Sequence, residues 1–488
     1  MKNRGRGVAC GWYGIARTAA MDRAAVWVEL DDGGTVKIAT GVTEIGEGVL
    51  TGLCQIAAQE MGVRPEDIVL GDNDTARVPE AAHAGATRMT YMIGNAVAVG
   101  CREAFGRFRV AMGAYWGVSP ESVKAFSGQV WVEGSASKRM SMEHAVHVLK
   151  KERGIVIVGS GLFTSAHTSL HPETGEATPW QSYVFGAQVA EVEVDDDTGE
   201  VQVLGVWAAH DVGRVINPQQ VEGQIEGSVI MGLGHALMEE YVQVNGETTT
   251  PGFAKYILPT ALDIPHVTSV LLTEPDPKTP LGVKGIGEPA ITPTAAAIIN
   301  AIYDAVGVRM TRLPATPERV MEALIANQVA ELTSEQFSSL SSAQLLAIET
   351  RDITSITTSA LKGITAAKIT ALSTAQLEAL SAAQVGTLST AQIDGLTTYQ
   401  ISSLSLGAIS SLTTSQIAAL NTAQISKLTT GQIRALNAAQ IVAIETADIR
   451  NLTTQQANAL SNVQVSSLSS AQFAALTSEH LASLSGDG

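Results

Sequence analysis

A repeat of eight residues constrains what the last third of this 488-residue chain can fold into. A leucine or isoleucine occupies every eighth position from Leu332 to Leu484, and the typical unit is Leu-Ser/Thr-x-Ala-Gln-Ile/Leu-x-x. Ser or Thr followed three residues later by Gln is a capping box, so each unit predicts a short helix. Eight residues exceed two ideal turns by about 80°, so one continuous helix would scatter the aliphatic side chains around its surface.

The pattern therefore predicts short helical segments that begin at each Ser or Thr and stack into an α-helical solenoid. A β-solenoid is an alternative, because Thr, Ile and Val suit strands, and low-complexity disorder is another. The repeat holds one histidine, His480, no cysteine and scattered charge. We expect no catalytic chemistry from it.

Composition separates the repeat from the preceding residues. All 16 prolines and all six tryptophans precede residue 326, which predicts two domains, 1–325 and 326–488. The net charge of −17 argues against nucleic acid or an anionic membrane as a partner.

Cysteine usage and the start of the chain bear on its location. Three cysteines without a Cys-x-x-Cys pair exclude a disulfide framework and carry no zinc or iron–sulfur signature. The basic residues 1–10 are not followed by an apolar run, and no segment reaches transmembrane length. We expect a cytoplasmic protein.

Residues 1–325 alternate between strand and helix patterns. Alternating apolar and polar residues interrupted by turn residues predict hairpins over 25–41 and 187–213. Helical periodicity and capping residues predict helices over 49–62, 217–240 and 294–306. Strand pairs interleaved with helices favour an α+β domain, with mixed sheets and packed helices, over a parallel doubly wound one.

A glycine-rich turn, LGVKGIGEPAITPTAA over 281–296, places the carboxylate of Glu288 just before an apolar helical pattern. Gly282, Gly285 and Gly287 permit close backbone approach to a ligand. Glu288 can act as a general base if burial raises its pKa. Alternatively, it complements the positive end of the following helix.

Four further segments stand in a fixed order before this turn. They are GRGVACGWYGIART (5–18), GVTEIGEGVLTGLCQIAAQEMG (41–62), GATRMTYMIGNAV (85–97) and HDVGRVINPQQVEGQIEGSVIMGLGHALMEE (210–240). Together with the turn, they resemble the second half of the molybdenum-binding large subunit of the xanthine oxidase and aldehyde oxidase family.

The resemblance implies a molybdopterin-binding domain in which Glu288 is the catalytic base. No residue of this chain would ligate the metal. The implied cofactor contacts are Gly46, Glu47, Gly48, Ala86, Thr87, Thr90, Gln224, Gly285 and Gly287. Glu47 stands where the family frequently has Gln, and an ionised glutamate can only accept hydrogen bonds, whereas an amide can also donate.

Several of these residues also have purely structural interpretations. Thr87 and Thr90 could cap the helix that follows them. The glycines around Gln224, at positions 223, 227 and 234, could serve helix packing alone. We expect His210 and Asp211 to stabilise a turn rather than to act in catalysis.

The resemblance also implies a function. The chain would belong to a molybdenum hydroxylase that oxidises a purine, N-heterocycle or aldehyde with oxygen from water. The cofactor would be molybdenum-molybdopterin, plain or as the cytosine dinucleotide. [2Fe–2S] clusters and FAD would lie on partner subunits, and another chain would supply the first half of the molybdenum domain. The alternatives are a catalytically silent scaffold that interacts through its repeat, or a tail that serves self-association.

Overall fold

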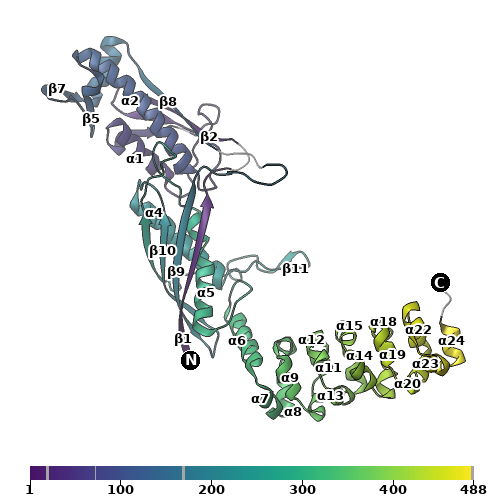
Figure 1. Ribbon diagram of the computed structural model, residues 1–488. Helices are drawn as coiled ribbons and strands as arrows, with labels where there is room; N and C mark the ends of the chain where they lie inside the picture. Colours follow the sequence, from purple (N-terminus) through teal and green to yellow (C-terminus); the bar gives the residue numbers. More distant parts are fainter. Residues whose placement is uncertain (18–20, 72, 167–170, 485–488) are drawn as a thin grey trace. The chain divides into compact units, whose positions relative to one another are not determined.

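The computed structural model describes residues 1–17, 21–71, 73–166 and 171–484 (Figure 1). The chain forms two compact units, Met1–Met321 and Glu322–Gly488, which are described separately. The unit boundary falls within helix α6 (Pro317–Glu331), close to the change of composition at residue 326. The domain limits 1–325 and 326–488 remain our proposal. None of the described helices is both long and apolar enough to span a bilayer.

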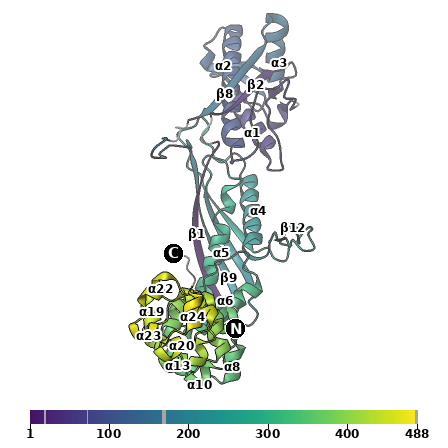
Figure 2. The ribbon, with the colours of Figure 1, turned by 90° about the vertical axis from the view of Figure 1, so that its right-hand side faces the viewer.

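A four-stranded sheet of order β1-β9-β10-β13 forms one layer of the first unit. Its strands are β1 (Lys2–Gly14), β9 (Tyr183–Asp195), β10 (Val201–Asp211) and β13 (His266–Leu272). Helix α5 (Thr294–Val306) lies along β1 and β9 (Figure 2). The packing is so close that a Cβ on Gly7 would lie 2.1 Å from the Ala297 carbonyl oxygen. Glycine at this position allows the helix to approach the strand.

A second sheet, of order β4-β3-β2-β8, carries helices α1 and α2. Its strands are β2 (Asp22–Leu30), β3 (Val36–Ala39), β4 (Ile68–Leu70) and β8 (Ile157–Ser165), and the helices are α1 (Val49–Met61) and α2 (Gly94–Trp116). Helix α2 crosses β8 and β2 (Figure 1). A Cβ on Gly161 of β8 would lie 1.9 Å from the Ala96 carbonyl oxygen, so glycine again sets the distance between helix and sheet.

Smaller elements complete the first unit. They are β5 (Val123–Phe126), β6 (Gln129–Val132), β7 (Ser135–Ser141), β11 (Gln243–Val244), β12 (Glu247–Thr248), α3 (Met142–His147), α4 (Pro218–Leu237), the 3₁₀ helices η1 (Pro65–Asp67), η3 (Pro120–Ser122) and η5 (Pro289–Ile291), and the π-helical segments η2 (Met89–Ile93) and η4 (Val148–Glu152).

The α+β architecture predicted for this unit is confirmed. Strands β2 and β3 pair antiparallel, as do β9 and β10, at the two predicted hairpins. Helix α1 ends at Gly62, whose φ of 68° is left-handed, and Asn217 caps α4 by accepting from Gln220 N at 3.2 Å. Strand β13, which pairs parallel with β10, was not predicted, because no turn motif connects the two.

The second unit consists of short helices. They are α7 (Ser334–Ser339), α8 (Ser342–Ala347), the 3₁₀ helix η6 (Thr350–Ser355), α9 (Thr358–Gly363), α10 (Ala366–Ile369), α11 (Thr374–Glu378), α12 (Ala382–Gly386), α13 (Thr390–Asp394), α14 (Thr398–Ser403), α15 (Leu406–Ser410), α16 (Thr414–Ala418), α17 (Thr422–Ile425), α18 (Thr430–Ala435), α19 (Ala438–Ala443), α20 (Thr446–Arg450), α21 (Thr454–Asn458), α22 (Asn462–Ser467), α23 (Ser470–Ala475) and α24 (Ser478–Ser483).

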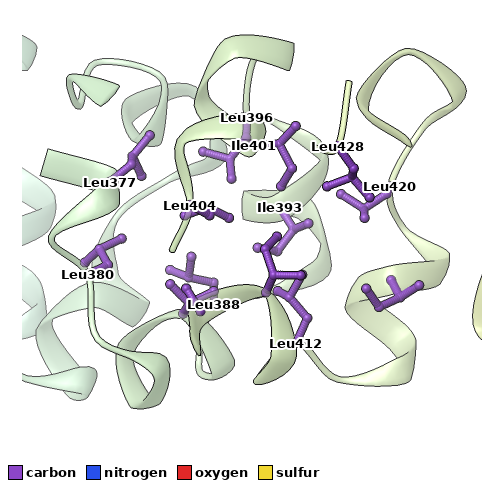
Figure 3. Packing of buried hydrophobic residues seen from close by; sticks show 14 of the residues in the cluster. Leu377, Leu380, Leu388, Ile393, Leu396, Ile401, Leu404, Leu412, Leu420 and Leu428 are labelled. Carbon is purple, nitrogen blue, oxygen red and sulfur yellow. The ribbon is translucent and has the colours of Figure 1, made fainter. Parts of the chain in front are cut away.

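The predicted capping box starts most of these helices. In α13, Ser389 Oγ accepts from Gln392 N at 3.2 Å, and Gln392 Oε1 accepts from Ser389 N at 2.6 Å. The same repeat buries Leu388 and Ile393, and equivalent pairs from its neighbours form one continuous apolar core (Figure 3). Most repeats therefore contribute one cap and two core side chains.

The buried glutamines connect units that are distant in the sequence. Gln392 Nε2 donates to Ile364 O at 2.7 Å and to Leu361 O at 3.0 Å, which lie 28 and 31 residues earlier. His480, in the glutamine position of its unit, places Nε2 2.8 Å from Leu452 O, again 28 residues earlier. We call this series the glutamine ladder. The α-helical solenoid is confirmed for the described repeat, and the alternatives of a β-solenoid and disorder are wrong.

Candidate functional site

A cavity of about 420 Å³ lies within the first unit. Four segments line it: residues 45–52 before and within α1, 84–90 before and within η2, 212–231 from the end of β10 into α4, and 284–291 before and within η5. Helix starts and turns surround this space, so backbone N–H groups and polar side chains are available to a ligand.

Glu288 stands at the start of η5 and lines the cavity. The residue before it is held from two sides. Gly287 N donates to Thr87 Oγ1 at 3.0 Å, and Ser228 Oγ donates to Gly287 O at 3.1 Å. The carboxylate itself is half-buried. Burial is the main cause that raises the pKa of Tyr13. The Glu288 carboxylate is a second, electrostatic cause, so the Tyr13 hydroxyl lies near enough to interact with it.

The loop that carries Thr87 is strained. Ala86 and Thr87 have φ of 54° and 48°, left-handed values that non-glycine residues seldom adopt. A Cβ on Gly285 would lie 1.9 Å from Thr87 O, so only glycine permits the two segments to approach. Neither Thr87 nor Thr90 caps the following helix, so that structural interpretation is wrong; Thr87 instead binds the turn before Glu288.

Glu44 organises the turn before α1. Its carboxylate accepts from Gly46 N at 2.9 Å, Gly48 N at 2.8 Å and Leu50 N at 3.2 Å. Burial acts to raise the pKa of Glu44, but these backbone hydrogen bonds outweigh it and hold the pKa below its ordinary value. Sequence reasoning missed this residue, because it lies four positions before the N-cap, Gly48, instead of at it.

Glu47 lies in the same turn and lines the cavity. Its Oε2 accepts from Ile45 N at 2.8 Å, its carboxyl group shares a hydrogen bond with that of Glu44, and Oε1 is buried without a donor among the described residues. Burial, with the neighbouring Glu44 carboxylate, raises the pKa of Glu47. The two carboxyl groups of this turn therefore differ in proton affinity.

Three cations also line the cavity. Arg88 is fully buried and forms a two-pronged ion pair with Asp22, at 2.7 and 3.0 Å. Lys284 Nζ lies 2.5 Å from Asp211 Oδ2. For the third, Arg214, the described part of the chain contains no side-chain hydrogen bond or ion pair, so its charge is available to an anionic ligand.

Asp211 stabilises a turn, as predicted, whereas His210 lies within a strand and makes no turn contact among the described residues. Asp211 accepts from Gly213 N at 3.2 Å in the turn and pairs with Lys284. His210 is fully buried in β10, outside the cavity lining, with Nε2 3.2 Å from Gln188 Nε2. Burial lowers the pKa of His210 from 6.5 to about 4.

The cavity brings together most of the predicted site residues. Those in its lining are Glu47, Gly48, Thr87, Thr90, Gln224, Gly285, Gly287 and Glu288. Gly46 and Ala86 lie outside the lining, although Gly46 N binds Glu44 and Ala86 O accepts from Ala16 N. Gly223 and Gly227 are solvent-exposed, and a Cβ on either would meet nothing within 4 Å, so they do not serve helix packing, and neither belongs to the cavity lining.

The first unit, an α+β fold with two four-stranded sheets and a cavity lined by apolar and polar residues, has the features of a ligand-binding domain, and a helical repeat follows it. A family model described as "Molybdopterin cofactor-binding domain" matches residues 1–265, and one described as "ALTTAQ repeat" matches 369–406, 425–462 and 441–478. The chain belongs to the molybdopterin cofactor-binding domain family, and its second unit is built of ALTTAQ repeats.

Relatives and solved structures agree with this assignment. The aldehyde oxidoreductase of Megalodesulfovibrio gigas is 32% identical over 330 residues, which cover 66% of this chain and 32% of the relative. The gamma subunit of the 6-hydroxypseudooxynicotine dehydrogenase complex of Paenarthrobacter nicotinovorans is 29% identical, covering 63% and 39%. The crystal structure of quinoline 2-oxidoreductase from Pseudomonas putida 86 is 27% identical with a TM-score of 0.57, covering 66% and 42%. This chain thus spans 32–42% of their lengths.

The cavity residues fit a phosphate-bearing pterin. The side-chain amides of Gln220 and Gln224 line the space without a hydrogen-bond partner in the described chain, and Arg214 adds an unpaired cation. A Cβ on Gly287 would lie 3.9 Å from both Gln224 Oε1 and Thr87 Oγ1, so the glycine keeps the space between them open. Amide donors, a guanidinium and a glycine-lined wall suit a flat ligand rich in acceptor atoms.

Proposed function

We propose that this chain is the cofactor-binding component of a molybdenum hydroxylase that oxidises a purine, N-heterocycle or aldehyde with oxygen derived from water. The observation that carries the proposal is the cavity in which Glu288 meets Gln224, Thr87 and Glu47 from three other segments. Family membership and relatives named as aldehyde and quinoline oxidoreductases support it.

The molybdenum-molybdopterin cofactor, when bound, would supply the redox-active metal for an oxidation whose oxygen comes from water. The chain's own residues would bind and orient the cofactor and would accept a proton. The Gln224 amide and the Thr90 hydroxyl would orient the pterin, and Arg214 would neutralise an anionic group on it. The contacts on Gly287 hold the backbone next to Glu288, whose carboxylate would accept the proton released during substrate oxidation.

Our proposal includes partners. The [2Fe–2S] clusters and FAD would lie on other subunits, and another chain would supply the remainder of the molybdenum domain. In support, the chain spans 32–42% of its relatives, and one relative is named as a subunit of a complex. The cysteines Cys10, Cys54 and Cys101 are all free, and Cys10 is exposed, which favours a reducing cytoplasmic location.

A second candidate is a catalytically silent scaffold that interacts through its repeat. The continuous core of the solenoid favours this candidate. A solenoid with its own core can fold and present a binding surface whether or not the first unit holds a cofactor. The two functions differ in what they require of the cavity: the hydroxylase requires it to hold molybdopterin, and the scaffold does not.

The deciding experiment measures molybdenum and pterin in the full chain, purified from a bacterium that makes the cofactor. Elemental analysis gives the metal, fluorescence of the oxidised pterin gives the cofactor, and nucleotide released by hydrolysis identifies the cytosine dinucleotide form. Near-stoichiometric metal and pterin would support the hydroxylase. A folded chain without either would favour the scaffold.

A further inference from the structure

We propose that Gln188 is a positioning residue for Glu288: its buried amide holds the backbone after Glu288, as Thr87 and Ser228 hold the backbone before it, and the neutral ring of His210 fixes the direction in which this amide points. The inference rests on the proposed function, because it takes Glu288 as the base. It gives a role to a buried polar cluster that lies outside the cavity lining.

The cluster consists of Gln188, His210 and Thr294, which lie on β9, β10 and α5 and are all fully buried. Gln188 Nε2 donates to Ala290 O at 2.6 Å, and Gln188 Oε1 accepts from Thr294 Oγ1 at 2.7 Å. Ala290 belongs to η5, the short helix that begins directly after Glu288. The Gln188 side chain therefore joins the sheet to the segment that carries the proposed base.

The backbone is anchored on both sides of Glu288. Gly287 is held by hydrogen bonds at its N–H and at its carbonyl oxygen. Ala290 is held at its carbonyl oxygen by Gln188. Only Glu288 and Pro289 lie between these anchors, and the proline ring fixes one of the few backbone torsions that remain there. Loss of the second anchor therefore frees the Glu288 carboxylate to move.

The neighbours of the Gln188 amide determine which way it points. Ala290 O can only accept, so it faces the NH₂ group. This group also lies 3.2 Å from His210 Nε2, which must then be an acceptor. The proton of the neutral ring is therefore on Nδ1, an atom without a partner among the described residues. An inverted amide would place Gln188 Oε1 against Ala290 O, two acceptors facing each other.

The neutral ring is a condition of this arrangement. Burial lowers the pKa of His210 to about 4, so the ring is uncharged at neutral pH. With a free lone pair on Nε2, the ring accepts one proton of the NH₂ group while Ala290 O accepts the other. Both protons of the amide are thus used, and the side chain has one favourable orientation.

The test uses the full chain without cofactor, labelled with ¹³C at the side-chain carboxyl of glutamate. The Glu288 signal is the one that Glu288→Gln lacks. Gln188→Met keeps the length of the side chain but has no donor, so we expect it to shift the Glu288 signal. Hydrogen exchange at the amides of Ile291 and Thr292 should rise by about tenfold or more.

Val192→Ala is the matched control. Val192 is fully buried on the same face of β9, so its truncation also destabilises the first unit. If Gln188 served stability alone, the two variants would affect the Glu288 signal equally. We expect Val192→Ala to leave this signal at its wild-type position.

A second variant covers the case in which Gln188→Met does not fold. Gln188→Asn keeps a buried amide, but the side chain is one methylene shorter and does not reach Ala290 O. It should shift the Glu288 signal as Gln188→Met does. In an assembled complex that turns over, either variant should lower kcat by about 10–100-fold, with KM and pterin content close to wild type.

The wild-type chain gives an independent readout of the cluster. Spectra of ¹⁵N-labelled histidine distinguish the two neutral tautomers of the ring, and the His210 signal is the one that His210→Gln lacks. We expect the proton on Nδ1. A proton on Nε2 would mean that Gln188 does not donate to His210, and the fixed orientation of the amide would be wrong.

The outcomes separate this inference from the proposed function. A Glu288 signal that stays in place in the Gln188 variants, or that shifts equally in Val192→Ala, would overturn the inference and leave the proposed function intact. If Glu288→Gln turns over as fast as Glu226→Gln, which changes an exposed glutamate of α4, then Glu288 is not the base, whatever the spectra show.

Discussion

At the scale of single residues, the position of Glu288 depends on contacts that its own side chain does not make. Thr87 and Ser228 bind the backbone of Gly287 from two different segments. The carboxylate itself has no side-chain hydrogen bond within the described residues, which leaves it available to a substrate or cofactor. A base that is positioned through its backbone can accept a proton without first breaking a competing interaction.

Replacing Glu288 with glutamine should abolish turnover while the cofactor is kept, because only the proton acceptor is lost. In an assembled complex we expect the rate to fall by about 10²–10⁴-fold with unchanged pterin content. Steady-state turnover and pterin fluorescence measure the two effects, with Glu226→Gln as the control. Wild-type-like rates would show that Glu288 is not the base.

Thr87→Val should loosen the turn before Glu288, because valine keeps the shape of threonine but removes the acceptor for Gly287 N. We expect the free energy of unfolding to fall by about 1–2 kcal/mol. Tryptophan fluorescence during denaturation measures this, since all six tryptophans precede residue 326. Thr87→Ser keeps the hydroxyl and should retain most of the stability, so equal losses in both variants would contradict the explanation.

His210 should make the first unit sensitive to acid. Its pKa falls from 6.5 to about 4 on folding, so the unfolded chain binds a proton that the folded chain does not. Above pH 6.5 His210 is neutral in both states and does not lower the free energy of unfolding. As the pH falls from 6.5 toward 4, protonation of His210 in the unfolded chain lowers that free energy. Wild type should lose about 2 kcal/mol more than His210→Gln between neutral pH and about pH 5. Denaturation curves at both pH values test this, and parallel losses would refute it.

At the scale of secondary structure, the solenoid is held together by contacts between helices three or four units apart. Gln432 shows how. Its Oε1 accepts from Thr429 N at 2.8 Å, and its Nε2 donates to Ile401 O at 3.1 Å and to Leu404 O at 2.9 Å. One amide therefore both starts its own helix and satisfies the last carbonyls of an earlier one.

Gln432→Ala should destabilise the middle of the repeat by about 1–3 kcal/mol, because buried carbonyls lose their donor. Hydrogen exchange of backbone amides in residues 398–436 measures the effect. Gln336 is the matched control, since it is exposed and makes the capping box without a ladder contact, so Gln336→Ala should cost less. Gln432→His should be milder than Gln432→Ala, because His480 occupies the same position naturally.

A feature could be predicted from the sequence when the residues that determine it lie close together along the chain. The capping boxes, the two hairpins and the α1 and α4 starts depend on residues within a few positions, so local patterns predicted them. The 28-residue reach of the ladder depends on the pitch of the solenoid, which an eight-residue period does not reveal. The Asp211–Lys284 and Arg88–Asp22 pairs join segments 73 and 66 residues apart, and no local pattern links them.

The segments of the candidate site could be predicted from the family resemblance, but the resemblance did not decide which residues of each segment line the cavity. Glu288, Gln224 and Thr87 were named from motifs and line one cavity. Gly46 and Ala86 were named in the same way, but the first is exposed and the second faces Ala16 through its carbonyl. Motif membership identifies a segment, whereas the three-dimensional fold decides which of its residues reach the ligand.

At the scale of the whole molecule, two compact units with separate cores follow one another in the chain. The family model for the cofactor-binding domain ends at residue 265, and the repeat matches begin at residue 369. All residues that line the cavity belong to the first unit. Cofactor binding and any role of the repeat should therefore be separable.

Deleting residues 332–488 should leave pterin content and the unfolding transition of the tryptophans unchanged, because every cavity residue and tryptophan remains. Pterin fluorescence and denaturation curves measure both. The oligomeric state of the shortened chain, measured by light scattering, tests the self-association role of the tail. An unchanged state would count against that role, and a loss of pterin would show that the repeat supports the cavity.

The glutamine ladder also affects how the number of repeats can change during evolution. Most repeats from Leu372 onward offer both a glutamine that reaches back and carbonyls that a later glutamine can reach. Gain or loss of one whole repeat preserves the spacing of 28 residues between a glutamine and the carbonyl that it reaches. Recombination between copies within the gene would thus yield foldable tails of many lengths, whereas an insertion of any other size would move leucines out of the core.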